Sequence, residues 1–350
     1  MTIELRVAQN NDKEEWDSMV SQSSQGTLFH QWEWLKIVER NSGSRLYPLI
    51  GMNKGSPIGL IPLFLQKIGP LKMVFSPPPH VVIFYLGPIF LKTDSLKQEK
   101  IESQYLEFQK QFEDFINTDL HAQYTFISLP PALHDPRPFK WSGYHIQLNF
   151  DYSTDLSIGA DSLFSSLDKR QRQDIKRAKE RNMTFEIGGE NEYKYILDLM
   201  DLRYAQQGKI VKVPRSYFVD LFKAYKDNIL VSTVKVDEEV VTGTIHLKYR
   251  DSVYSWVGNP KPIKSLSPSP NDLLIWESIR YATENGYRYY TALSAAGNKR
   301  LHLYYAGKCN PALNIRYTAT KKSIPADLVE RGYLNILQPV LQKVRTMSHS

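Results

Sequence analysis

The sequence predicts an α/β (α+β) protein of two tandem domains, each with a mixed, mainly antiparallel sheet. Three observations lead to this prediction. The chain has 350 residues, more than one small domain usually contains. Residues 31–63 can be laid on residues 215–247 without a gap, at a constant offset of 184 residues. A similar order of elements then follows each of these two segments.

The first copy begins with an expected helix, in which Trp34, Ile37 and Val38 lie at helical spacing. Alternating apolar residues then indicate the two strands of a hairpin, the second of which reads G-x-I-x-L in both copies. The expected elements of the first copy are helix 31–40, strands 46–52 and 59–63, helix 96–117 and strand 124–129. Those of the second copy are a helix from 216, strands 230–236 and 243–247, helix 272–285 and strand 287–293.

The polar, turn-rich segment 151–160 marks the expected domain boundary. We therefore expect an N-terminal domain at 1–152, a C-terminal domain at 153–322 and a final helix within 323–350. One long helix is expected at 161–182, since Asp161 or Ser162 can cap its start.

Composition limits the class of protein. Forty-four basic and 37 acidic residues give a net charge of +7, which is compatible with anionic partners and equally with an ordinary surface. Cys309 is the only cysteine, so an internal disulfide and a Cys-x-x-Cys metal site are excluded. The start of the sequence is too polar for a signal peptide, and the longest apolar run, 81–91, is too short to span a membrane. We expect a cytoplasmic protein without an integral membrane segment.

Three segments could carry chemistry. Segment 168–181 holds seven basic and three acidic residues, and its helix would present a ridge for phosphates or only a solvated face. Segment 208–215 is a basic loop before a helix, which could bind an anion or simply connect two elements. Segment 294–311 follows a strand and is either a binding loop or a connector. Their candidate binding residues are Lys176, Arg177, Lys212, Arg215, Lys299, Tyr304, Tyr305 and Lys308.

Familiar catalytic motifs are missing from the sequence. It contains no phosphate-binding P-loop, no dinucleotide fingerprint, no HExxH and no GxSxG. His246 lies in an expected strand and is interpreted as structural, and a lone Cys309 is interpreted as inert. The general base therefore stays unassigned.

Four further stretches are FHQWEWLK, LGPIF, LDKRQRQDIKRAKERNMTFEI and LLIWESIRYATENGYRYYTAL. In their order and spacing, they together resemble the FemABX family of peptidyl (aminoacyl) transferases, over roughly residues 25–320. The resemblance implies two tandem domains of the GNAT acyltransferase fold. It also implies that Trp34 and Lys36 lie on a substrate-binding helix, and that Lys36 contacts a nucleotide-sugar precursor. The family's Phe-Lys pair corresponds here to Tyr304-Tyr305.

The resemblance implies transfer of an aminoacyl group, from aminoacyl-tRNA, to an amine of a cell-envelope precursor. No metal or redox cofactor is expected, because positioning and electrostatics can carry acyl transfer. An acyl-CoA-dependent N-acyltransferase acting on an amino sugar or polysaccharide precursor is the second hypothesis. It lacks support from a [QR]xxGx[GA] loop, of which neither half has a convincing copy. The third hypothesis is a non-catalytic binder of a nucleotide-sugar or RNA.

Overall fold

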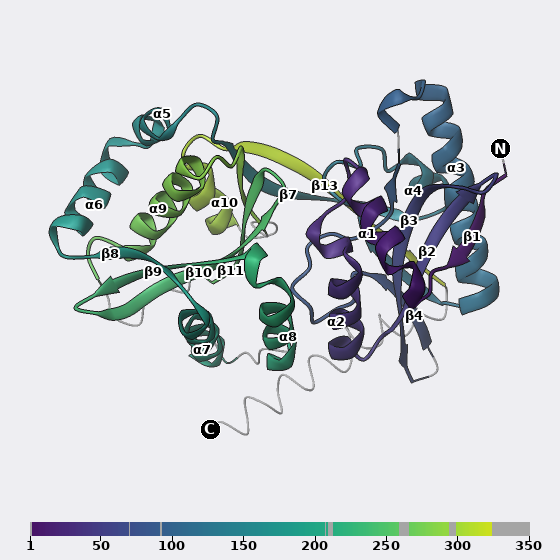
Figure 1. Ribbon diagram of the computed structural model, residues 1–350, viewed down its shortest axis with the longest axis horizontal. Coiled ribbons are helices and arrows are strands. Elements are labelled where there is room, and N and C mark those ends of the chain that lie inside the picture. The colour runs from purple at the N-terminus through teal and green to yellow at the C-terminus, as the bar shows by residue number, and fades with distance from the viewer. Residues whose placement is uncertain are drawn as a thin grey trace. The chain divides into compact units, whose positions relative to one another are not determined.

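The computed structural model describes residues 2–69, 71–91, 93–206, 208, 213–258, 266–293 and 299–323 (Figure 1). The chain folds into two compact units. The first unit consists of Met1–Pro79, Tyr85–Gln147 and Tyr317–Ser350. The second unit consists of His80–Phe84 and Leu148–Arg316. Each unit therefore contains a segment from outside its own half of the sequence.

The sheet of the first unit has the strand order β1-β2-β3-β4-β6-β13. Neighbouring strands are antiparallel except β4 and β6, which are parallel. The short β5 pairs with Gly59 and Leu60, near the start of β3. The strands are β1 (Glu4–Val7), β2 (Arg45–Asn53), β3 (Ser56–Ile68), β4 (Leu71–Ser76), β5 (Ile89–Phe90), β6 (Tyr124–Ser128) and β13 (Ala312–Lys322). The helices are α1 (Lys13–Gln22), α2 (Trp32–Ser42), α3 (Gln98–Phe115) and α4 (Arg137–Trp141).

The sheet of the second unit has the equivalent order, β8-β9-β10-β11-β12-β7, and its parallel pair is β11 and β12. Helices α5, α6, α9 and α10 lie on one face of this sheet, and α7 and α8 lie on the other (Figure 1). The strands are β8 (Thr184–Gly188), β9 (Ile229–Val236), β10 (Glu239–Tyr249), β11 (Ser252–Gly258), β12 (Tyr289–Ala292) and β7 (His145–Asp155). The helices are α5 (Ala160–Ser166), α6 (Lys169–Glu180), α7 (Glu190–Gln206), α8 (Arg215–Tyr225), α9 (Pro270–Glu284) and α10 (Lys299–Ala306).

The last strand of each sheet comes from the other half of the chain. Strand β7 follows the elements of the first unit in sequence, yet its residues Tyr152 to Asp155 pair with β12 of the second unit. The first unit is completed instead by the end of β13, where Thr318 lies opposite Ser128 of β6. The range that we expected for the C-terminal domain, 153–322, thus ends in residues that pair within the first unit. Alternation along a strand identifies its buried face and does not identify its partner.

The repeated order of helix, hairpin, helix and strand is present in both units. The glycine of the G-x-I-x-L strands has a packing role in each. A Cβ on Gly59 would lie 2.8 Å from the carbonyl oxygen of Ile89, and one on Gly243 would lie 2.7 Å from Ile196 Cδ1 of α7. Glycine therefore lets a neighbouring element approach the middle of each sheet.

One expected helix is divided in the structure, and another lies outside the described residues. The single helix expected at 161–182 is two helices, α5 and α6, separated at Leu167. The break occurs because Asp168 caps α6, its carboxylate accepting a hydrogen bond from the Gln171 backbone N–H at 2.8 Å. The expected C-terminal helix within 323–350 falls almost wholly outside the described residues.

A buried ion pair joins β7 and β13 within the second unit. The side chains of Asp151 and Arg316 are only 2% and 5% exposed. Arg316 donates through Nε to Asp151 Oδ2 at 2.5 Å and through Nη1 to the carbonyl oxygen of Phe84 at 3.0 Å. One guanidinium therefore connects two strands and the segment His80–Phe84 that the second unit takes from earlier in the chain.

We expect Arg316→Met to lower the free energy of unfolding by about 3–5 kcal/mol, because it leaves a buried carboxylate without its partner. Urea unfolding followed by circular dichroism measures this loss. The control is Arg40→Met, which breaks an exposed pair with Glu33 and should cost at most about 1 kcal/mol. Equal losses in the two variants would contradict the role of the buried pair.

His30 is a fully buried histidine in the first unit. Its Nδ1 accepts hydrogen bonds from Thr27, so Nε2 carries the proton and donates to the carbonyl oxygen of Leu86 at 2.5 Å. Burial lowers the pKa of His30 from 6.5 to about 4, against an opposing effect of its backbone hydrogen bonds. The ring is therefore neutral in the folded protein at pH 7.

Folding lowers this pKa, so the folded protein binds a proton at His30 less readily than the unfolded chain does. The contribution of His30 to the free energy of unfolding is therefore fully present above pH 6.5 and is lost as the pH falls from 6.5 towards 4. The loss attributable to His30 is about 3 kcal/mol across that range. We expect His30→Gln, which can keep one donor and one acceptor, to reduce this acid sensitivity. Urea midpoints between pH 4 and 7 test it, with the exposed His145→Gln as the control. An unchanged pH profile in His30→Gln would contradict the assignment.

Candidate functional site

The carboxyl ends of the parallel strands are the first place to look for a ligand, because binding sites of α/β sheets form there. In the first unit, Leu86 and Gly87 occupy the carboxyl ends of β4 and β6. Leu86 donates its backbone N–H to Ser128 O at 2.8 Å, and Gly87 donates to Ser76 Oγ at 3.0 Å. Gly87 has a φ of +57°, and a Cβ there would lie 3.1 Å from Ser128 O. The LGPIF stretch therefore closes this end of the first unit.

The equivalent place in the second unit lies where β11 and β12 end. The strands pair as far as Ser255 and Ala292, and Leu293 then donates its N–H to Ser255 O at 3.4 Å. The residues that follow, 259–265 and 294–298, are outside the described part of the chain. After these two segments the described chain continues at Leu266, before α9, and at Lys299, the first residue of α10.

A polar cluster occupies the start of α9. Asp272, in the first turn, forms an ion pair with Lys308 and accepts a hydrogen bond from the Tyr304 hydroxyl at 3.3 Å. The Lys308 ammonium lies 4.5 Å from the centroid of the Tyr304 ring, a cation–π contact. The adjacent Asn271 accepts a hydrogen bond from Thr242 Oγ1 of β10 at 2.7 Å. Helix α9 is thereby connected to both its sheet and the segment after α10.

The electrostatics of this cluster favour fixed hydrogen-bond donors. Only 8% of the Lys308 side chain and 19% of the Asp272 side chain is exposed. Burial, and then the negative charge of Asp272, raise the pKa of Tyr304 well above its ordinary value, so this phenol remains a donor. Burial also raises the pKa of Cys309 to about 12, which keeps it a thiol and agrees with its interpretation as inert.

His246 is buried on the sheet of the same unit. Its ring lies 5.8 Å from the Tyr290 ring, and neither ring nitrogen has a hydrogen-bond partner among the residues that the structure describes. Burial lowers the pKa of His246 to about 3, so the ring is neutral at pH 7. Its position in the core of the second unit agrees with the structural interpretation.

Helix α6 presents only part of the expected basic ridge. Arg172 donates to backbone carbonyl oxygens of Ser165 and Leu167, and Lys179 pairs with the buried Glu277 of α9 at 2.7 Å. These two cations hold α6 in place. Arg177 pairs with Asp174, whereas Lys176 is exposed and has no ion-pair partner in the described part of the chain. The free charge on this helix is therefore smaller than its sequence indicates.

The other expected site residues lie in varied surroundings. Trp34 is completely buried and packs edge-on against Phe29 at 5.2 Å, so it has no exposed surface for substrate and acts in the core. Lys36 is partly exposed and pairs with Glu39. Arg215 pairs with Asp198 at 2.7 Å and also bonds the Lys194 carbonyl, both on α7.

The remaining expected residues also lie in different surroundings. Lys299 is exposed at the start of α10, and Tyr305 packs edge-on against Tyr304 at 5.5 Å. Lys212 lies outside the described residues. Thus Tyr304 and Lys308 come together around Asp272, an acidic residue that sequence reasoning missed, and Tyr305 packs beside Tyr304. The sequence does place Asp272 in the first turn of an expected helix. An aspartate there is also common simply because it stabilises the helix N-terminus, so it does not by itself indicate a site.

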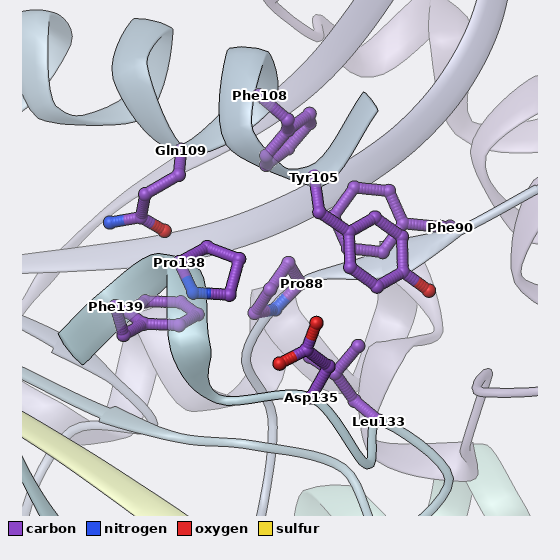
Figure 2. A pocket seen from close by; sticks show the side chains of 9 residues that line it. All are labelled: Pro88, Phe90, Tyr105, Phe108, Gln109, Leu133, Asp135, Pro138 and Phe139. Atoms are coloured by element: carbon purple, nitrogen blue, oxygen red, sulfur yellow. The ribbon is translucent and has the colours of Figure 1, made fainter. Parts of the chain in front are cut away.

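A second feature that sequence reasoning missed is an apolar pocket in the first unit, between α3 and the segment that leads into α4 (Figure 2). It leaves about 10 Å³ for the centre of a water-sized group. Its lining consists of Pro88, Phe90, Tyr105, Phe108, Gln109, Leu133, Asp135, Pro138 and Phe139. Such a pocket holds one small group, and its walls offer few partners to a water molecule.

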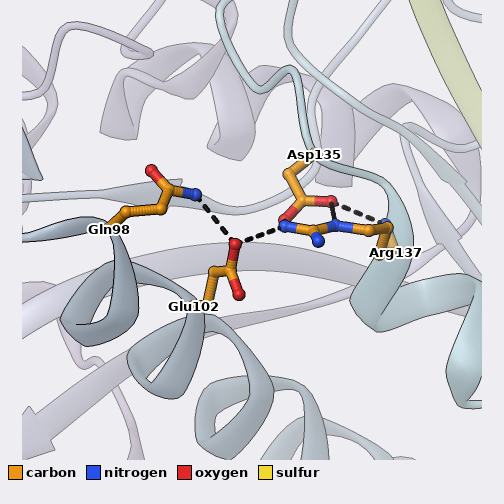
Figure 3. Close-up of polar contacts among 4 residues, drawn as sticks. All are labelled: Gln98, Glu102, Asp135 and Arg137. Atoms are coloured by element: carbon orange, nitrogen blue, oxygen red, sulfur yellow. Dashed lines mark hydrogen bonds and ion pairs between the residues drawn. The ribbon is translucent and has the colours of Figure 1, made fainter.

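A charged network borders this pocket (Figure 3). Arg137 donates through Nε to Asp135 Oδ1 at 2.8 Å and through Nη2 to Glu102 Oε1 at 2.6 Å. Gln98 donates to the same Glu102 oxygen at 2.9 Å. Hydrogen bonds from Gln98 and Arg137 lower the pKa of Glu102, and those from Arg137 outweigh burial to lower the pKa of Asp135. Both carboxylates are therefore ionised at neutral pH.

The described ranges hold neither a metal cluster nor a membrane-spanning helix. No group of three or more His, Cys, Asp or Glu side chains within them is arranged to hold a metal ion. No helix there is both long enough and apolar enough to cross a bilayer.

Comparison with known proteins defines the class. Residues 165–300 match the family model described as an acetyltransferase (GNAT) domain. No curated protein matches the sequence. The domain match lies in the second unit and includes the expected basic helix and α9. The expectation of an acyltransferase is confirmed at this level.

Solved structures with similar folds cover nearly the whole chain. A crystal structure of FemX matches with a TM-score of 0.65 and 13% identity, over 90% of this chain and 96% of that one. A tandem GNAT protein from the clavulanic acid biosynthesis pathway has a TM-score of 0.54 and 13% identity, over 91% and 98%. The C-terminal domain of a putative lysylphosphatidylglycerol synthetase from Agrobacterium fabrum has a TM-score of 0.53 and 14% identity, over 91% and 94%. The expected FemABX-like fold of two GNAT-like units is confirmed.

We expect Asp272→Asn to lower the free energy of unfolding by at least about 2 kcal/mol, because it leaves the Lys308 ammonium buried without a counter-charge. The double variant Asp272→Asn/Lys308→Met removes that charge and should recover part of the loss. Urea unfolding of the two single variants and the double variant measures the coupling. Strictly additive losses would show that the pair does not interact.

Proposed function

We propose that this protein is an N-acyltransferase of the FemAB type. It transfers an aminoacyl group, with aminoacyl-tRNA as the donor, to an amine of a cell-envelope precursor. The observation that carries the proposal is the FemX-like fold over 90% of the chain. A further similar fold belongs to a putative lysylphosphatidylglycerol synthetase, whose name also describes a product carrying an amino acid.

The chemistry requires few catalytic groups. An ammonium acceptor loses a proton, its nitrogen attacks the ester carbonyl of the donor, and a C–N bond forms as the ester C–O bond breaks. The departing tRNA hydroxyl takes a proton, and hydrogen-bond donors stabilise the negative oxygen of the intermediate. Lys308 is the donor that we assign to this part of the second unit, because its ammonium has three N–H groups and only part of them is used by Asp272. No metal or redox cofactor enters these steps.

Aminoacyl-tRNA carries many phosphates, so its binding also needs positive charge on the surface of the protein. Lys176 and Lys169 of α6 are exposed and have no ion-pair partner among the described residues. They can neutralise phosphates without reading bases. Lys36 of α2 is assigned to the precursor. These steps need no membrane-spanning segment, and a cytoplasmic location supplies aminoacyl-tRNA.

An acyl-CoA donor is the second candidate. The family model that matches 165–300 describes an acetyltransferase domain. The structure of the tandem GNAT protein of the clavulanic acid pathway is described as one without AcCoA, so AcCoA is named in connection with that protein. The two donors give different products under the same assay conditions. Purified protein that acylates an amino sugar from acyl-CoA, with no RNA present, would replace the tRNA proposal.

We expect Lys176→Ala to reduce transfer from aminoacyl-tRNA by about tenfold at low salt, because phosphate contacts are electrostatic. The same change should also make the rate less dependent on salt concentration. Initial rates with radiolabelled aminoacyl-tRNA, measured at several salt concentrations, provide the test. Lys223→Ala, on the exposed surface of α8 in the same unit, is the matched control.

Treatment with ribonuclease should abolish transfer in every variant. Lys36→Ala should raise the KM for the precursor and leave that for the tRNA unchanged. Failure of both Lys36→Ala and Lys176→Ala to change transfer would reject these site residues.

A further inference from the structure

His302 of α10 lies beside the end of a parallel strand in the second unit. Strand β7 runs antiparallel to β12, and its Tyr152 lies opposite Ala292, the last residue of β12. Phe150 therefore continues past the end of β12. The centroid of the His302 ring lies 5.7 Å from that of Tyr152 and 6.4 Å from that of Phe150. The imidazole thus stands at the carboxyl end of β12, the edge at which α/β sheets form their binding sites.

These two ring contacts orient the imidazole and leave its nitrogens available. Both neighbours meet it nearly edge-on, Phe150 at 74° and Tyr152 at 75°. The His302 side chain is partly exposed, and neither ring nitrogen has a hydrogen-bond or ion-pair partner among the described residues. A neutral imidazole has one nitrogen that donates a proton and one that accepts a proton. His302 can therefore offer both to a bound molecule.

Other titratable side chains of the second unit lack this freedom. Asp272 and Asp151 each form an ion pair with a mostly buried cation. His246 is fully buried, so its ring nitrogens cannot meet a substrate. Burial raises the pKa of Cys309 and keeps it a thiol. Of these groups, only His302 combines an accessible ring with two uncommitted nitrogens.

We propose that His302 is the proton shuttle of the transfer reaction. The acceptor amine, after one proton has passed to solvent, attacks the ester carbonyl and forms the C–N bond. His302 then takes a second proton from that nitrogen through its unprotonated ring atom. The resulting imidazolium gives a proton to the ribose oxygen as the C–O bond breaks, so His302 ends neutral, as it began. This role rests on the proposed function and supplies the general base that the sequence leaves unassigned.

Three variants separate proton transfer from packing, with initial rates measured from aminoacyl-tRNA and from acyl-CoA. His302→Phe keeps an aromatic ring but cannot carry a proton, and we expect its kcat to fall about hundredfold while the KM for the donor changes less than about twofold. His302→Ala should lose as much, and added imidazole should raise its rate about tenfold by replacing the missing base. Imidazole should not help His302→Phe, whose ring fills the space. Leu303→Ala, at the next residue and 69% exposed, is the control and should keep the wild-type rate.

A chemical measurement locates His302 without any transfer. Diethyl pyrocarbonate modifies accessible neutral imidazoles, and mass spectrometry of peptides identifies each modified histidine. The probe ligand is an adenosine that carries its amino acid through a 3′-amide, which cannot be transferred. At four times its Kd, this ligand should slow the modification of His302 about fivefold, because it covers the side chain in proportion to its occupancy. His145, which is exposed in the first unit, should be modified equally with and without the ligand.

Transfer by His302→Phe at the wild-type rate, or a loss confined to KM, would overturn the shuttle and leave the proposed function standing. If the wild-type protein uses acyl-CoA and not aminoacyl-tRNA, the proposed function fails, and the same variants decide the role of His302 with that donor. If it uses neither donor, the proposed function fails and the modification experiment decides. Protection of His302 by the amide then supports its place beside the reacting ester, and lack of protection overturns it.

Discussion

The exchange of the last strands between the two halves of the chain is the constraint on which the rest of the structure depends. Each sheet needs a sixth strand, and each receives it from the other half of the sequence. In the second unit the exchanged strand β7 is held by the buried pair of Asp151 and Arg316, and the same guanidinium binds Phe84. Neither sheet therefore has all its strands until most of the chain has been made.

The two copies share a topology but differ in the polar groups that they carry. At the ends of the parallel strands, the first unit inserts Leu86 and Gly87 and satisfies their backbone groups with Ser128 and Ser76. The second unit gathers Asp272, Tyr304 and Lys308 at the adjoining helix. One copy thus fills the ends of its parallel strands with its own chain, and the other has charged and hydroxyl groups at the start of α9. Duplication of a fold does not require duplication of its site.

The polar groups of the two units also suit different ligands. On α6 of the second unit, exposed Lys176 without an ion-pair partner among the described residues suits phosphate, whose binding weakens with salt. In the first unit, Arg137 pairs with both Asp135 and Glu102 beside an apolar pocket, and the one negative charge left over disfavours a phosphate ligand there.

The sequence by itself determined the two-copy organisation, because a constant offset between residues 31–63 and 215–247 survives in the order of apolar positions. It also led to the FemABX-like class and named Tyr304, Tyr305 and Lys308 among the candidate residues of segment 294–311. Only the tertiary structure decided which strand completes which sheet, since pairing partners leave no mark in the period of a single strand. It alone placed Trp34 in the core, joined Asp272 to Lys308 and formed the pocket between α3 and α4, because contacts between segments far apart in sequence depend on the packing of the whole unit.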